Sequence, residues 1–210
     1  MNLFKDRIDA GKQLTKKLLK YKTKDTIVLA IPRGGVVIGN EIAKTLNAKL
    51  DIVVPRKIGS HEDPEFAIGA VAPDGSIALD ESAVESLHIK ESYINKVVNE
   101  ELREIKRRME AYRGNKPFPK LTGKTIILVD DGVATGNTII ASVKFIKKQQ
   151  PKKIVVAVPV APSDFVNKIS GMADEVISLK PLEPYYAISM HYINFEQTTD
   201  EEVIEILSRY

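Results

Sequence analysis

Apolar residues in this chain fall into short continuous runs that alternate with stretches in which they recur every three or four residues. The continuous runs predict buried strands, which we place at residues 26–31, 50–55, 126–129, 154–160 and 175–179. The helical spacing predicts helices at residues 2–20, 36–46, 91–112, 139–150, 163–170 and after residue 199. Because strands that are apolar on both faces are typical of parallel sheets, the expected fold class is α/β, with a doubly wound and mainly parallel sheet.

A second pattern interrupts this alternation between the second and third predicted sheet strands. Phe66–Val71 and Ser76–Leu79 flank Ala72-Pro73-Asp74-Gly75, which is a strong hairpin signal. The longest helical pattern, Glu91–Tyr112, comes after the hairpin. We therefore expect a β-hairpin and a long helix to form an insertion at about residues 56–120.

The length of the chain favours a single domain over residues 1–210. We place its core at about residues 26–180 and a small C-terminal hood segment at about residues 181–210. No internal repeat or low-complexity segment suggests a second domain.

Composition narrows the class of protein. The formal net charge of +3 is mild, so nucleic acid is not expected as the principal partner. No apolar stretch approaches the ~20 residues of a membrane span, and no membrane association is expected. The absence of cysteine excludes a disulfide scaffold and fits a reducing compartment. With no apolar core of signal-peptide length near Met1, the expectation is a soluble, cytoplasmic protein.

Candidate chemistry concentrates in one stretch, Ile126–Thr138, where Asp130 and Asp131 end an apolar strand and a loop leads into a helix. Ligands bind beyond the carboxyl ends of parallel strands, and the unpaired N–H groups of a helix N-terminus favour an anion. Gly132 and Gly136 let the backbone approach a ligand closely. The aspartates would accept from sugar hydroxyls or a hydrated cation, beside donors for a phosphate. For a bare Asp-Asp-Gly, a solvated turn with an N-cap is the ordinary alternative.

The whole string closely resembles the binding motif for phosphoribosyl diphosphate (PRPP) of the type I phosphoribosyltransferases: an apolar strand, paired acidic residues, and a small-residue loop ending in Thr-Gly-x-Thr. It lacks the Lys of a Walker A loop and the G-x-G-x-x-G of a dinucleotide site. The resemblance implies a glycosyltransferase of the pentosyltransferase type, in nucleotide metabolism or salvage. Such an enzyme moves 5-phosphoribose from PRPP to a nitrogenous base and releases pyrophosphate.

The resemblance also implies a role for each residue of the motif. Asp130 and Asp131 would be catalytic and accept hydrogen bonds from the ribose 2- and 3-hydroxyls. They would hold the cofactor Mg²⁺ mostly indirectly, through water and the ribose hydroxyls. The residues that would bind the PRPP 5-phosphate are Gly132, Val133, Ala134, Thr135, Gly136, Asn137 and Thr138.

A second glycine loop, Pro32-Arg33-Gly34-Gly35, follows the first predicted strand. Alone, it reads as an ordinary tight turn with a surface arginine. In the resembling family a loop of this form holds the pyrophosphate end of PRPP, which makes Arg33, Gly34 and Gly35 candidates for that role and Arg33 a catalytic candidate. The family often has a cis peptide bond before the basic residue, and here that bond is Pro32–Arg33.

Two further pairs of basic residues are candidates by position. Arg56 and Lys57 match, by place and charge, the start of a mobile hood loop that meets the pyrophosphate in the family, so both are catalytic candidates. Arg103 and Arg107 lie on the long helix, where they either form a solvated basic face or reach the pyrophosphate or a partner subunit.

Tyr185 and Tyr186 are candidate base-binding residues, because the family uses this region for the acceptor base. Simple packing of amphipathic rings is the alternative. The partners expected are PRPP and a small base, and the chain is expected to form a homo-oligomer, as a dimer. A rival function is a non-catalytic sensor or regulator that binds PRPP or a nucleotide on the same fold. The sequence leaves open the acceptor base, catalytic competence, the oligomeric state and the contribution of the lid and the basic helix.

Overall fold

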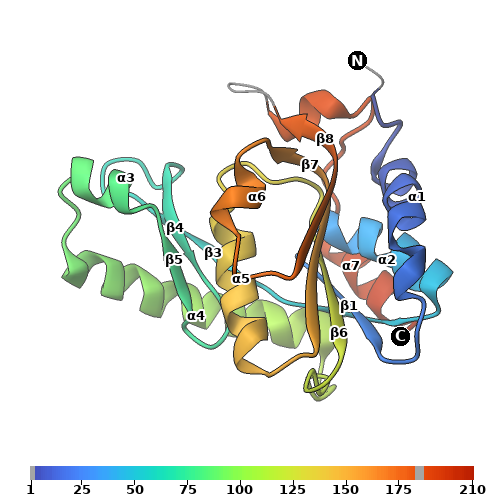
Figure 1. The fold of residues 1–210 in the computed structure, drawn as a ribbon. Helices are drawn as coiled ribbons and strands as arrows, with labels where there is room; N and C mark the ends of the chain where they lie inside the picture. The colour runs from blue at the N-terminus through green and yellow to red at the C-terminus, as the bar shows by residue number, and fades with distance from the viewer. Residues whose placement is uncertain (1–2, 183–186) are drawn as a thin grey trace.

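The computed structural model describes residues 3–182 and 187–210 and contains a parallel sheet with helices on both faces, beside a smaller antiparallel sheet (Figure 1). The order of the strands in the parallel sheet is β2-β1-β6-β7-β8. These strands are β1 (Thr26–Ala30), β2 (Lys49–Ile52), β6 (Thr125–Val129), β7 (Lys153–Pro162) and β8 (Glu175–Leu182). All neighbouring strands in this sheet run parallel, which confirms the predicted fold class.

Alternate side chains of each buried strand enter two separate hydrophobic cores. On β6, Ile127 and Val129 face the core that includes α1, α2 and α7, while Ile126 and Leu128 face the core that includes α5 and α6. Figure 1 shows these two groups of helices on opposite sides of the sheet. The helices are α1 (Arg7–Leu18) with the 3-10 turn η1 (Leu19–Tyr21), α2 (Gly34–Leu46), α5 (Asn137–Lys148), α6 (Phe165–Lys168) and α7 (Asp200–Leu207).

The predicted hairpin is present, and a third strand that was not predicted pairs with it. The antiparallel sheet has the order β3-β4-β5. Its strands and the two helices that follow are β3 (Arg56–Gly59), β4 (Ala67–Val71), β5 (Ile77–Leu79), α3 (Glu81–Ser86) and α4 (Glu91–Arg113). The sequence predicted a loop starting at Arg56 and Lys57, but these residues pair with Val71 and Ala70, so the turn-rich segment begins only after Gly59. None of the helices in the two described ranges is long and apolar enough to cross a membrane.

The N-terminal segment lies against the C-terminal part of the chain. The Phe4 N–H donates to the His191 carbonyl at 2.9 Å, and the Ile193 N–H donates to the Phe4 carbonyl at 2.8 Å. The 3-10 turn η2 (Ile188–His191) precedes this contact. Helix α1 begins at Arg7, later than predicted, because the Asp6 side chain caps it by accepting from the Asp9 N–H at 2.8 Å.

The long helix α4 is fixed to the main sheet by a buried ion pair. Arg113 donates from Nε to Asp51 Oδ1 at 2.7 Å and from Nη2 to Asp51 Oδ2 at 3.0 Å. The two side chains are only 9% and 10% exposed. A bidentate contact of this kind joins the end of the insertion to strand β2.

We expect Asp51→Ala to lower the free energy of unfolding by about 3–5 kcal/mol, because it leaves the Arg113 charge buried without its carboxylate. For a chain of this size the melting temperature should fall by roughly 10 °C, as followed by circular dichroism. Glu205→Gln is the matched control: its ion pair with Arg209 joins exposed side chains, so the melting temperature should move little. Equal losses for the two variants would contradict the assignment.

Candidate active site

Two loops meet at the carboxyl ends of the neighbouring strands β1 and β6. The strands are in parallel register, with Ala30 opposite Val129, and the Ile31 N–H donates to the Val129 carbonyl at 2.8 Å. The Pro32–Arg33 loop therefore lies directly beside the Asp130–Asp131 loop. The peptide bond between Pro32 and Arg33 is cis, as the resemblance implied.

Glycine in the first loop allows close contact with the two aspartates. A Cβ atom built on Gly34 would lie 2.0 Å from the Asp131 Oδ2 atom, and one on Gly35 would lie 2.9 Å from the Val129 carbonyl oxygen and 3.0 Å from the Asp130 Cα atom. No side chain larger than hydrogen fits at Gly34 unless Asp131 moves. The structure thus brings together four of the predicted site residues.

Asp130 is a partly buried carboxylate beside another carboxylate. Burial, followed by the negative charge of Asp131, raises the pKa of Asp130 well above its ordinary value, while the positive charges of Arg7 and Lys57 oppose that rise. Its Oδ1 atom accepts from the Asp131 N–H at 2.8 Å. A group held in this way favours a hydrogen-bond donor or a cation next to it.

Asp131 is paired with a residue that sequence reasoning missed. Arg7, the first residue of α1, approaches the Asp131 Oδ2 atom at 2.8 Å from Nε and at 2.8 Å from Nη2. Burial still raises the pKa of the Asp131 carboxyl, while Arg7 acts in the opposite direction. Arg7 lies 124 residues away in the chain, and nothing in its local sequence separates it from the other basic residues of an amphipathic helix.

The loop between β6 and α5 forms a turn at the helix N-terminus. Gly136, with φ of +86°, is the N-cap residue of α5, and this conformation suits glycine. Asn137 is 5% exposed, and its Nδ2 atom has no hydrogen-bond partner among the described residues. Ala134 and Thr135 are exposed. An unpaired buried donor beside a helix N-terminus is the chemistry expected where an anion binds.

Arg33 is paired with an acidic residue of the C-terminal helix. Its Nη1 atom lies 3.3 Å from Asp200 Oδ1, at the first residue of α7. Tyr112 also donates to Asp200 Oδ1, at 2.6 Å. Asp200 would thus compete with a pyrophosphate group for Arg33.

The two basic residues on β3 have different surroundings. The Lys57 side chain is exposed, and its charge lowers the pKa of Asp130 against the larger effect of burial. Arg56 instead forms a 2.6 Å ion pair with Glu101 on α4. The two candidates are therefore not equivalent.

The basic face of α4 is a solvated surface in the described structure. Arg103 is exposed, and Arg107 donates from Nε to Glu104 Oε2 at 2.7 Å. Hydrogen bonds from Arg107 and then Arg108 lower the pKa of Glu104 to about 2. These contacts favour the solvated interpretation of Arg103 and Arg107 over contact with a phosphate.

The predicted base-binding residues Tyr185 and Tyr186 lie outside the described residues. Another tyrosine of the same region, Tyr192, is buried, and its hydroxyl donates to the Asp131 carbonyl oxygen at 2.8 Å. Gly132 is also covered by this segment, since a Cβ atom there would lie 2.5 Å from Ile188 Cγ2. The segment after β8 therefore packs directly on the acidic loop.

The family model for the phosphoribosyl transferase domain matches residues 3–184. The chain belongs to this family. Both the acidic loop and the Pro32–Gly35 loop fall inside the matched range.

Similar proteins agree with this membership. A Mycobacterium tuberculosis H37Rv protein that carries the provisional name of phosphoribosyl transferase is 40% identical over 209 residues, or 100% of this chain and 47% of the relative. The chain thus spans about half the length of the curated relatives it matches. The solved structure of TT1426 from Thermus thermophilus has 36% identity and a TM-score of 0.81, with 99% of each chain covered. The AQ2163 protein from Aquifex aeolicus, at 15% identity and a TM-score of 0.52 over 97% of this chain and 87% of that one, shares the fold.

The acidic pair of this phosphoribosyltransferase-family chain is suited to a hydrated cation rather than to a full cage of protein ligands. Within the two described ranges, no group of three or more His, Cys, Asp or Glu side chains could hold a metal ion. The two adjacent carboxylates are nevertheless partly buried oxygen donors with raised pKa values. Mg²⁺ keeps several of its waters and typically takes one or two carboxylates, so this donor set fits it.

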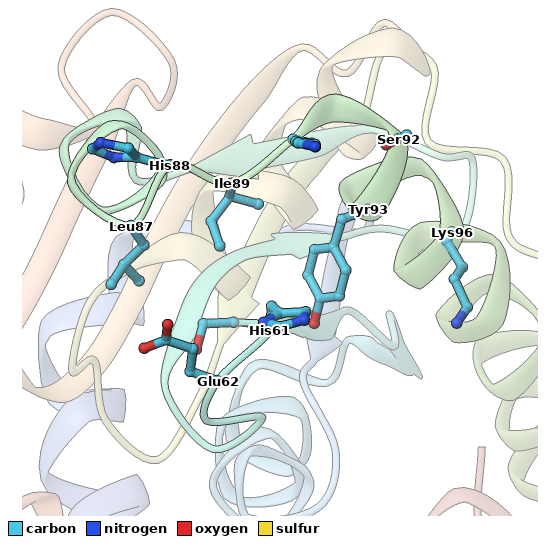
Figure 2. A pocket seen from close by; sticks show the side chains of 10 residues that line it. His61, Glu62, Leu87, His88, Ile89, Ser92, Tyr93 and Lys96 are labelled. Carbon is cyan, nitrogen blue, oxygen red and sulfur yellow. The ribbon is translucent and has the colours of Figure 1, made fainter.

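A surface cavity of about 440 Å³ lies on the insertion, away from the loop that carries Asp130 and Asp131 (Figure 2). His61, Tyr93 and Lys96 are among the residues that line it. The His61 and Tyr93 rings meet edge to face at 5.8 Å between centroids. None of the predicted site residues within the described ranges lines this cavity, so its size alone does not mark the family's active site.

We expect Asp130→Asn to stabilise the protein when divalent cations are absent. Because the folded-state pKa of Asp130 lies above its unfolded value, protonation of Asp130 stabilises the folded protein. This stabilisation is lost as the pH rises from about 4 through the folded pKa. The amide keeps the acceptor for the Asp131 N–H and removes the charge.

Thermal unfolding of both proteins between pH 4 and pH 8 tests this. The melting temperature of Asp130→Asn should exceed that of the wild type by an amount that grows with pH and is smallest near pH 4. A variant that is less stable at pH 8, or a difference that does not depend on pH, would show that Asp130 has a structural role.

Proposed function

We propose that this protein is a Mg²⁺-dependent phosphoribosyltransferase that moves the 5-phosphoribosyl group of PRPP to a nitrogenous base and releases pyrophosphate. The observation that carries the proposal is the partly buried pair Asp130 and Asp131, set beside a glycine loop and a helix N-terminus. Carboxylates with raised pKa values are stabilised by hydrogen-bond donors and by positive charge. A ribose that develops positive charge supplies both.

The loop before α5 is the proposed site of the 5-phosphate. The donors for phosphate oxygens are the N–H groups at the start of the helix, the hydroxyls of Thr135 and Thr138, and the Asn137 amide, which has no partner among the described residues. Gly136 permits the close approach of the backbone. The whole of Gly132–Thr138 is proposed to take part.

Catalysis in this proposal is electrostatic. As the bond between ribose and pyrophosphate breaks, the ribose becomes oxocarbenium-like and Asp130 and Asp131 stabilise the growing positive charge. Lys57 and Arg33 would stabilise the negative charge on the leaving group, with Asp200 as a competing partner of Arg33. Glu101 would compete in the same way for Arg56. Bound Mg²⁺ would neutralise part of the charge on the leaving group.

The remaining features of the proposal follow from the family and the composition. The base would bind near the segment after β8, with Tyr185 and Tyr186 as candidates. A cytoplasmic dimer acting in nucleotide salvage fits the absence of cysteine and the mild charge. The core, the insertion and the hood are proposed to act as one domain over residues 1–210.

The test is phosphorus NMR of PRPP with the protein, Mg²⁺ and a pooled set of purine and pyrimidine bases. We expect pyrophosphate to appear only when a base is present, and omission of single bases should name the acceptor. Asp130→Asn should lower the rate by about 100-fold or more, because it removes a charge aimed at the transition state. Glu205→Gln, on the exposed face of α7, is the matched control and should keep the wild-type rate.

Each other outcome has a distinct meaning. Line broadening of PRPP without pyrophosphate would support the rival function, a sensor that binds PRPP without turning it over. Unchanged spectra at high protein concentration would contradict PRPP binding altogether.

A further inference from the structure

Each nitrogen of the Arg7 guanidinium group makes a polar contact. Nε and Nη2 lie 2.8 Å from Asp131 Oδ2, and Nη1 donates to the Glu196 carbonyl oxygen at 2.6 Å. The Cζ atom lies 3.8 Å from the centre of the Phe195 ring. The Arg7 side chain is only 12% exposed. Hydrogen bonds and a cation–π contact thus fix a buried guanidinium against the second aspartate.

The backbone around Arg7 is also built into the protein. The Asn194 N–H donates to the Lys5 carbonyl at 2.9 Å, and Phe4 forms a parallel bridge with Tyr192. The Phe4 and Tyr192 rings are 5.3 Å apart. These contacts set the start of α1 relative to the segment that covers the acidic loop, so the position of Arg7 is not that of a free surface side chain.

Because Gly34 has no side chain, the ion pair between Arg7 and Asp131 fits directly beside its backbone. A Cβ atom on Gly34 would lie 2.6 Å from Arg7 Nε and 2.0 Å from Asp131 Oδ2. Three segments that are distant in the sequence, at residues 7, 34 and 131, therefore meet at one carboxylate oxygen.

The hydrogen bond from Arg7 goes to one oxygen of the carboxylate. A guanidinium fork commonly binds the two oxygens of a carboxylate in parallel, but Nε and Nη2 of Arg7 both approach Oδ2 here. Among the described residues, Arg7 donates no hydrogen bond to the Oδ1 atom of Asp131. Arginine suits this task better than lysine, because its charge is permanent and its donors lie in a rigid plane.

We propose that Arg7 is a positioning residue of the PRPP site, which holds Asp131 by Oδ2 so that Oδ1 is oriented towards the ribose hydroxyls. The proposal rests on the proposed function, since it names PRPP as the ligand that Asp131 receives. Arg7 acts through Asp131 and does not itself touch the ribose. Arg7, on the N-terminal helix α1, also places a permanent positive charge beside the two aspartates.

The test is a double-mutant cycle on PRPP affinity, with Mg²⁺ present and with the dissociation constant measured by phosphorus NMR titration. Arg7→Met should weaken PRPP binding by about 10-fold or more, a size typical of residues that orient a ligating side chain. Arg7→Lys should lie between Arg7→Met and the wild type, because it keeps the charge and loses the fork. In the background of Asp131→Asn, Arg7→Met should change the affinity by less than about twofold, since its target is gone.

Asp6→Ala is the matched structural control. It removes the N-cap of the same helix and leaves Arg7 in place, so the melting temperature should fall while the affinity for PRPP stays that of the wild type. If Asp6→Ala weakens binding as much as Arg7→Met does, the effect belongs to the folding of the N-terminal segment, and the proposal is wrong.

The other results separate this proposal from the proposed function. If the wild type binds PRPP and Arg7→Met binds it equally well or more tightly, Arg7 is not a positioning residue, and the tighter binding would make it an internal competitor of the ligand. Losses that add fully in the double variant would also overturn it. If the wild type itself neither binds nor converts PRPP, the proposed function fails and the role of Arg7 fails with it.

Discussion

The partial burial of two adjacent carboxylates is the constraint on which the rest of this structure depends. Asp130 and Asp131 follow β6 with both residues partly buried, and the loss of solvation raises the pKa of both. The two like charges repel each other. Positive charges from two elements distant in the sequence, Arg7 on α1 and Lys57 on β3, reduce this repulsion. The remaining unfavourable energy is what a cation or a developing positive charge on a ligand would relieve.

The two ends of the chain act together at this constraint. The segment at Phe4–Lys5 pairs by backbone hydrogen bonds with residues 191–194, and Tyr192 donates its hydroxyl to the Asp131 carbonyl. Each end thus supplies one polar contact to the second aspartate, Arg7 from α1 and Tyr192 from the C-terminal segment. This arrangement explains why a helix with an ordinary amphipathic sequence, α1, contributes a buried charge to the site.

Prediction from the sequence succeeded where the signal was local. The strand before Asp130 and the long helix α4, predicted at Glu91–Tyr112, appear within a residue or two of their expected positions, because strand and helix periods are written in consecutive side chains. The hairpin was found from Pro73-Asp74-Gly75, whose turn preference is also local. Strand β3 was missed because its pairing with β4 depends on residues that lie beyond the intervening turn-rich segment, from Ala67 to Val71. In the same way, the contacts of Arg33 with Asp200 and of Arg56 with Glu101 give no signal in either residue's own neighbourhood.

By itself, the sequence determined the class of the fold, the family motif and the residues that could bind a phosphate and a ribose. These depend on side-chain periodicity and on the order of residues within one loop, both of which are contained in short segments. Which charges act on those residues depends on the tertiary structure. Arg7 pairs with Asp131, and Lys57 acts on Asp130 through its charge. Arg33 and Arg56 pair with other acidic residues. The physical reason is that Coulomb interactions and desolvation depend on distance and burial in space, which separation along the chain does not give.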